Sequence, residues 1–218
     1  MKAFVSAKAM GRADEMAIRE FGIPAFALME SAGRESAKIS ADLFNDTAKN
    51  VVILCGKGNN GGDGFAFARY ILGSCSNVLV VHISKAVELS ATASEHFTVL
   101  NKVAQTADIL SVTHLDEIDI DSVRPDVIVD ALLGTGMQSN LRRPLSDLVD
   151  WANKQNAFRI ALDLPTGLHP DTGAIGNPVF RADITFRWRR RRSGWYLAMV
   201  RCTPAGNLPS TLESRHPQ

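Results

Sequence analysis

Apolar residues follow two kinds of pattern along the chain, and the two kinds alternate from about residue 50 onward. Val51 to Cys55 form an unbroken apolar run, which is typical of a strand covered on both faces of a parallel sheet. Similar runs predict further strands near residues 77–83, 107–112, 126–130 and 158–163. Stretches with helical spacing predict helices over residues 65–72, 89–104 and 145–156. This alternation predicts a doubly wound α/β fold with right-handed crossovers.

Two helices are predicted ahead of the first strand. Apolar residues recur at helical spacing from Met10 to Phe21, and Ser6 is suited to cap that helix. Residues 22–24, Gly-Ile-Pro, end it, and the proline can open a second helix that runs to about Phe44. These helices are additions to the simplest α/β pattern, and they could cover a face of the sheet or form a dimer contact.

The first predicted strand leads into a glycine-rich segment, residues 56–64, which contains five glycines in nine residues. Three of them fit the dinucleotide pattern G-x-G-x-x-G, but the next strand ends in Ser84 and Lys85, without the acid that binds a ribose. Asp63 also puts a negative charge at the helix start, where a pyrophosphate would bind. The asparagine and aspartate side chains of this segment suit binding to sugar hydroxyls, an amide-bearing ring or a cation. A purely structural role, with Asp63 as a helix cap, stays open.

Aspartates end two further predicted strands, and turns that contain glycine follow both. Asp130 precedes residues 134–136, Gly-Thr-Gly, and Asp163 precedes residues 166–167, Thr-Gly. Because ligands bind at the carboxyl ends of the strands in such sheets, we expect these segments to converge with the glycine-rich segment. Aspartate, asparagine and hydroxyl oxygens suit a monovalent or hard divalent cation, and a nearby aspartate can act as a general acid or base.

Composition and charge exclude several other classes of function. The net charge of +1 gives no overall reason to expect binding to nucleic acid or a membrane. No apolar stretch is long enough to span a bilayer. The three cysteines lack metal or disulfide spacing, which fits a reducing compartment. With neither a signal-peptide core nor a transit-peptide composition at the start, we expect a cytoplasmic protein.

Three motifs, in this order, resemble the YjeF N-terminal domain family, that of NAD(P)H-hydrate epimerase. They are GKGNNGGDG from residue 56, VDALLGTG from residue 129 and DLPTG from residue 163. The segments 22–24 and 28–33 also resemble the family's N-terminal helices. The resemblance covers residues 1–186. It implies a Rossmann-like three-layer α/β/α sandwich with a mainly parallel sheet and two extra N-terminal helices.

The resemblance also implies an activity and its site. The family epimerises the R and S forms of hydrated NADH and NADPH (NADHX and NADPHX), so that a separate dehydratase can restore the coenzyme. Asp163 matches the family's substrate-binding acid, and we expect it to transfer a proton. Asn60, Asp130 and Thr166 match the ligands of a potassium ion (K+), with threonine where the family usually has serine. The substrate-binding positions implied are Asn59, Asn60, Gly61, Gly62, Asp63, Gly134, Thr135, Gly136, Met137, Gln138, Ser139, Asn140 and Asp163.

The resemblance ends at Phe186, where the composition changes abruptly. Residues 187–192 read Arg-Trp-Arg-Arg-Arg-Arg, and the following residues to 218 are rich in Pro, Ser, Thr and Arg. Three interpretations stay open: a divergent disordered end, a basic patch for nucleic acid, and an end read out of frame, which the abrupt change favours. We therefore predict one domain over residues 1–186 and an atypical Arg-rich tail over 187–218, with no further strand recognised in it. The dehydratase domain that many bacterial relatives carry is expected to be a separate protein or lost with the same end.

Other functions also stay open. The main alternative is a non-catalytic YjeF-type binding or scaffold module, because relatives of this fold serve as scaffolds. A scaffold has no need of all the polar site residues, which favours the enzyme; these are Asn59, Asn60, Asp63, Asp130 and Asp163. The missing ribose-binding acid counts against an ordinary NAD-dependent dehydrogenase. The family also suggests a homodimer through the N-terminal helices.

Overall fold

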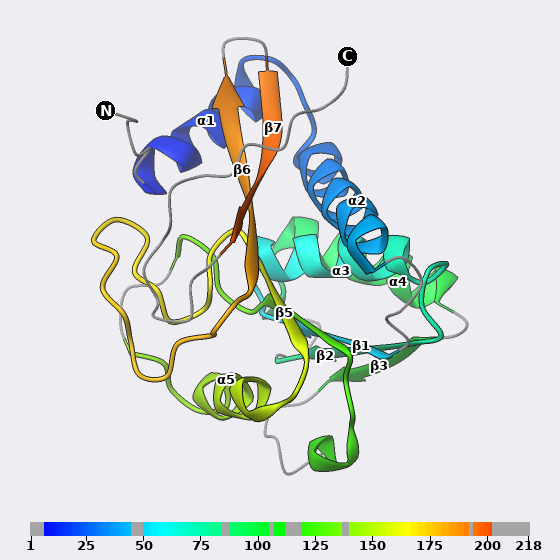
Figure 1. Cartoon of the computed structure of the whole chain (residues 1–218). Coiled ribbons are helices and arrows are strands. Elements are labelled where there is room, and N and C mark those ends of the chain that lie inside the picture. Colours follow the sequence, from blue (N-terminus) through cyan, green and yellow to red (C-terminus); the bar gives the residue numbers. More distant parts are fainter. Residues whose placement is uncertain are drawn as a thin grey trace.

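The computed structural model of the chain describes residues 7–44, 50–83, 88–104, 107–111, 119–136, 140–191 and 194–201 (Figure 1). In chain order its elements are α1 (Ala7–Arg19), α2 (Ala25–Phe44), β1 (Asn50–Cys55), α3 (Asn59–Ile71), β2 (Asn77–His82), α4 (Ala91–Val103), β3 (Ala107–Ser111), a short 3-10 helix (Ile120–Ser122), β4 (Val127–Ala131), α5 (Leu145–Lys154), β5 (Phe158–Leu162), β6 (Ile184–Arg191) and β7 (Gly194–Arg201). None of the described helices has the length and apolar character needed to cross a membrane.

The strands form one seven-stranded sheet in the order β3-β2-β1-β4-β5-β6-β7. All neighbouring pairs up to β6 are parallel, and β7 is antiparallel to β6. β1 pairs with β2 on one side and with β4 on the other, so the strand order reverses between β1 and β4. This confirms the predicted Rossmann-like α/β fold, and such a reversal opens a crevice at the carboxyl ends of the two strands.

Two apolar clusters lie on opposite faces of the sheet, and β1 contributes to both. Val51 and Ile53 belong to the cluster under α2, α3 and α4, whereas Val52 and Leu54 belong to the cluster under α5 (Figure 1). Successive side chains of a strand point to opposite faces, so a strand that is covered twice needs apolar residues at every position. The unbroken apolar run of the sequence therefore reflects the three-layer sandwich.

The N-terminal helices pack differently from each other. α2 lies directly on α3, and a Cβ atom at Gly33 would come within 2.4 Å of the Ala66 Cβ. On α1, Ala17 is buried, but Phe21, which continues the same helical spacing in the sequence, is 63% exposed. The reason is that α1 ends at Arg19 and Gly22, with a φ of +66°, turns the chain away.

β6 and β7 extend beyond Phe186, where no further strand is predicted from the sequence. The two strands pair from Ile184 opposite Arg201 to Arg191 opposite Gly194, and Ala198 and Val200 are buried. In β6 the arginines hide the strand pattern, because residues 189–192 are four consecutive arginines and break the apolar alternation. β7 follows these arginines directly, and its apolar run from Trp195 to Val200 is not interpreted as a strand from the sequence. Whether the domain boundary lies at residue 186 stays a prediction.

Candidate functional site

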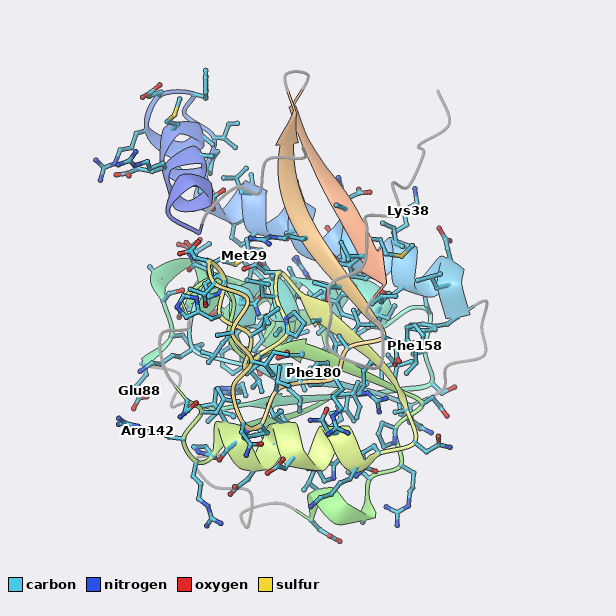
Figure 2. All side chains as sticks on the ribbon, turned by 60° about the vertical axis from the view of Figure 1, so that its left-hand side comes forward. Met29, Lys38, Glu88, Arg142, Phe158 and Phe180 are labelled. Atoms are coloured by element: carbon cyan, nitrogen blue, oxygen red, sulfur yellow. The ribbon has the colours of Figure 1, made fainter. Side chains whose placement is uncertain are left out.

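A cavity of about 970 Å³ lies at the crevice where the strand order reverses. Its lining includes residues of the turns after β1 and β4 and residues of α1 and α2. Figure 2 labels Met29 of α2 and Glu88, which comes after β2, and both belong to its lining. The convergence of the glycine-rich segment with Gly134 and Asp163 at this cavity confirms the expectation from the sequence.

Residues 59–64 of the glycine-rich segment form the start of α3, because the helix begins at Asn59, six residues earlier than predicted, and only residues 56–58 precede it. Glycine is required here by close packing. A Cβ at Gly56 would lie 1.9 Å from the Leu132 carbonyl oxygen, and one at Gly61 would lie 1.8 Å from the Gly56 carbonyl oxygen. The low helix propensity of glycine is therefore overridden by contacts that only glycine allows.

Asn60 is a buried polar side chain near the start of α3. It is 8% exposed and lines the cavity, and neither its amide oxygen nor its amide nitrogen forms a hydrogen bond within the described structure. Its neighbour Asn59 is exposed and accepts a hydrogen bond of 2.9 Å from the Ser90 hydroxyl. A buried amide without partners is costly, which indicates that a ligand or ion satisfies Asn60.

Asp130, at the end of β4, is fully buried and bound by Thr166. The Thr166 backbone N–H donates to Oδ2 over 2.7 Å, its hydroxyl donates to Oδ1 over 2.8 Å, and the Leu132 N–H donates to Oδ1 over 3.1 Å. Burial raises the pKa of Asp130 to about 6, although these hydrogen bonds oppose the rise. The donors are neutral, so a cation is well suited to balance this charge.

Asp163 follows β5 in a left-handed conformation, with a φ of 62°. Such a conformation costs on the order of 1–3 kcal/mol in a residue other than glycine and is concentrated at functional sites. The half-buried carboxylate accepts a hydrogen bond of 3.0 Å from the Thr135 N–H. Burial raises the pKa of Asp163, while Arg187 of β6 and the Thr135 N–H lower it in part. Arg187 therefore influences the site, although the sequence analysis placed it in the tail.

Two more carboxylates line the cavity with Asp163. Asp63 is half-buried on α3, and burial and then the charges of Asp163 and Asp14 raise its pKa well above the usual value. Asp14 of α1 stays partly open to solvent, and loss of hydration and then the charge of Asp163 raise its pKa. Asp14 is not among the site residues predicted from the sequence. No signal in the sequence distinguishes it from the other charged residues of α1, and its place in the lining is set by the packing of the helix.

The predicted site residues do not all lie in the cavity. Those that line it are Asn59, Asn60, Asp63, Gly134, Thr135, Gly136 and Asp163. Gly61 and Gly62 instead face the protein, against Gly56 and Met29. Asp130 and Thr166 lie behind the cavity-lining Leu133, whose N–H donates to the Thr166 hydroxyl over 3.0 Å. Asn140 is exposed and outside the lining, and Met137, Gln138 and Ser139 lie outside the described residues.

Comparison with known proteins places this geometry in a family. The family described as YjeF-related protein N-terminus matches residues 25–189. The chain belongs to this family. The matched stretch begins at α2 and ends within β6, so the YjeF-related match contains the glycine-rich turn, Asp130, Asp163 and Thr166.

Individual relatives agree with this assignment. The chain is 41% identical over 190 residues to the bifunctional NAD(P)H-hydrate repair enzyme Nnr of Salinibacter ruber, which covers 83% of this chain and 35% of that protein. It is 38% identical over 183 residues to the NAD(P)H-hydrate epimerase of Rhodopirellula baltica, and the match covers 84% of this chain and 72% of that protein. The crystal structure of yeast ynu0 is similar with a TM-score of 0.73 and 26% identity, covering 84% of this chain and 79% of that one. The chain thus spans about a third of the bifunctional relative.

Proposed function

We propose that this protein epimerises the R and S forms of hydrated NADH and NADPH. The observation that carries the proposal is the acid Asp163, held beside Gly134 and Asn60 in a cavity at the crevice of the sheet. A relative that is named NAD(P)H-hydrate epimerase and aligns over most of both chains supports it. The protein is accordingly an isomerase.

The chemistry of the substrate explains why an acid is needed. Addition of water to the reduced nicotinamide ring puts the hydroxyl on the carbon beside the ring nitrogen, because the nitrogen lone pair stabilises positive charge there. The two epimers differ in the face that carries this hydroxyl. Asp163 is suited to protonate the departing hydroxyl, because its raised pKa increases the fraction of protonated carboxyl near neutral pH.

The cavity also has groups that suit the rest of the substrate. α3 is capped by Gly58, which has no side chain to accept from the first N–H groups of the helix. These backbone N–H groups therefore remain for a polar or anionic group of the substrate. Lys57 and Arg34 line the cavity and can balance the negative phosphates. Asn59, Asn60 and Asp63 offer amides and a carboxyl to the ring or the sugar hydroxyls.

We also propose K+ as the cofactor, held by Asn60, Asp130 and Thr166. The residues fit the ion, because the set is made of hard oxygens, one buried carboxylate faces neutral donors, and the Asn60 amide oxygen is unpartnered. A bound ion would neutralise Asp130 and fix the turns after β1, β4 and β5 relative to one another. Thr166 keeps the hydroxyl that a serine would supply.

The wider context of the reaction follows from the same proposal. We place it in the cytoplasm, where a separate dehydratase would consume the S epimer, and we expect a homodimer through the N-terminal helices. The fused relatives named bifunctional repair enzymes support the link to such a partner. NADHX and NADPHX are both proposed as substrates.

The test is direct epimerisation. Pure R-NADHX is supplied in K+ buffer, and the S form is followed by chromatography, with Asp163→Asn as the matched variant. Conversion well above the spontaneous rate by the wild type, and its loss in the variant, is the expected result. A folded wild-type protein that binds NADHX without converting it would favour the binding module instead.

A further inference from the structure

α1 brings Asp14 into the cavity at a position that the proposed reaction leaves unused. Gly11, Asp14 and Ile18, spaced as one face of the helix, all line the cavity. Asp14 lies outside the stretch 25–189 that matches the family. Its neighbour Glu15 points elsewhere and pairs with Arg19 over 3.2 Å, both of them exposed. The face of α1 that meets the cavity therefore carries a single carboxylate.

Asp14 and Asp163 reach the same cavity from different elements of the fold. Each lines the cavity, and the charge of Asp163 is among the causes that raise the pKa of Asp14. Asp163 is held by the Thr135 N–H, whereas Asp14 remains open to solvent. Asn60, which is nine-tenths buried and unpartnered, lines the same cavity and indicates that a polar ligand completes it. The carboxylates thus surround a built site rather than a bare acidic surface.

An epimerisation at one carbon needs proton transfer on both faces of the ring. A group on one face can protonate the hydroxyl that leaves, but the water that re-adds comes from the other face and must lose a proton there. One carboxyl cannot reach both faces of a bound ring at once. Asp63 is less suited to the second role, because it is more enclosed and cannot exchange its proton with solvent as readily.

We propose that Asp14 is the second catalytic acid–base residue and works on the face of the ring opposite to Asp163. This assignment rests on the proposed epimerase function. In one direction Asp163 gives its proton to the hydroxyl, the C–O bond breaks with its electron pair leaving in water, and the ring nitrogen lone pair forms the C=N bond of an iminium. A water molecule then adds to the opposite face, and Asp14 takes its proton. The nitrogen regains its lone pair, and solvent exchange resets the two carboxyls.

Oxygen exchange tests this assignment in a way that a structural role cannot imitate. R-NADHX and S-NADHX are incubated separately in ¹⁸O-water with wild type, Asp14→Asn and Asp163→Asn, and each epimer is analysed by mass spectrometry. Each variant should lose epimerisation by about 100-fold or more, which is the range for removal of a general acid or base. In each variant the remaining carboxyl should still catalyse exchange of the hydroxyl oxygen with ¹⁸O-water, but only in the epimer whose hydroxyl lies on its face of the ring. The two variants should therefore label opposite epimers.

Matched controls keep the test decisive. Glu15→Gln, one residue away on the same helix, should leave both reactions at the wild-type rate, and Asp14→Glu should restore part of the epimerisation. Melting curves check that Asp14→Asn is folded, which its partly exposed position favours. If Asp14→Asn epimerises at the wild-type rate, or if both variants introduce ¹⁸O into the same epimer, the second-acid proposal alone is overturned. A wild-type protein that neither epimerises nor exchanges oxygen overturns the proposed function as well.

Discussion

Thr166 donates two hydrogen bonds to Asp130, one from its backbone N–H over 2.7 Å and one from its hydroxyl over 2.8 Å. The contact joins the turn after β5 to the end of β4, thirty-six positions apart in the chain. The same hydroxyl accepts a hydrogen bond from the Leu133 N–H. One side chain therefore holds the buried carboxylate and the cavity wall together.

Replacing Thr166 by valine should destabilise the protein by about 1–3 kcal/mol, because the half-buried Leu133 N–H loses its acceptor and the buried Asp130 Oδ1 loses one of its two donors. Urea unfolding measures the loss. Thr166→Ser keeps the hydroxyl and should stay within about 1 kcal/mol of the wild type. A valine variant as stable as the serine variant would show that the hydroxyl contributes little.

Potassium should stabilise the wild type and raise its melting temperature in K+ titrations. At a K+ concentration of about 100 times its Kd the gain is roughly 2.7 kcal/mol. Na+ and a bulky organic cation are the controls, at equal ionic strength. Because Thr166→Val removes a proposed ligand, its K+ response should be weaker. An equal response to all three cations in the wild type would speak against the site.

Gly134→Ala should impair the reaction while leaving the fold intact. A Cβ at this position would lie 2.6 Å from Asp163 Oδ2, so the carboxylate has to move. A displacement of about 1 Å at a reacting group can lower the rate about 100-fold. The measurement is kcat for epimerisation together with the melting temperature. Gly73→Ala is the matched control, because nothing lies within 4 Å of its added Cβ; equal kcat values for both variants would contradict the prediction.

Glu30 of α2 should make stability depend on acid pH. It accepts hydrogen bonds from Arg69 and Tyr70 of α3, and its Oε2 lies 3.6 Å from Nδ1 of His96. Burial alone would raise the pKa of Glu30, but Tyr70 and Arg69 outweigh it and the pKa is lowered. The folded state therefore holds this proton less tightly than the unfolded chain. The stabilisation is present above the ordinary glutamate pKa and is lost as the pH falls through the lowered value.

Glu30→Gln tests this dependence by urea unfolding at a series of pH values. The variant should lose about 1–3 kcal/mol at pH 7, and the difference from the wild type should shrink below pH 4. Glu15→Gln, which removes half of an exposed pair with Arg19, is the control and should change stability by less than about 1 kcal/mol at any pH. A constant difference from pH 7 to pH 3 would mean that Glu30 acts by packing and not by charge.

Truncation after Phe186 should lower the melting temperature by roughly 5 °C or more. It removes β7, whose Ala198 and Val200 are buried, and a buried valine alone contributes about 2 kcal/mol. Arg187, which lowers the pKa of Asp163, is lost with it. The alternative prediction, that residues 187–218 are not native sequence, requires an unchanged melting temperature and unchanged activity.

The sequence predicts the sheet well because its strands are covered on both faces. The apolar run at β1 and the acids Asp130 and Asp163 mark strand ends that the structure brings to one crevice. The start of α3 could not be predicted, because glycine has low helix propensity. The requirement for glycine arises from two close contacts, of Gly56 with Leu132 and of Gly61 with Gly56, which the sequence pattern does not show. Contacts of this kind become visible only in three dimensions.

Asp14 and β6 could not be found from local pattern either. Asp14 is one of several charged residues of α1, and only the packing of that helix shows which of them meets the cavity. In β6, pairing between strands overrides the unfavourable arginine-rich composition. β7 does contain an apolar run, Trp195–Val200, but it follows the arginines directly and is not interpreted as a strand from the sequence. The role of Asp14 and the strand conformation of β6 thus depend on contacts that the local sequence pattern does not show.

Approach to equilibrium from both sides tests the central claim most directly. Pure R-NADHX and pure S-NADHX are each incubated with the protein in K+ buffer, and the ratio of epimers is followed by chromatography. An epimerase must bring both reactions to the same final ratio with the same relaxation rate, far above the spontaneous rate, and Asp163→Asn must abolish the acceleration. A folded protein that leaves both epimers at the spontaneous rate would contradict the account.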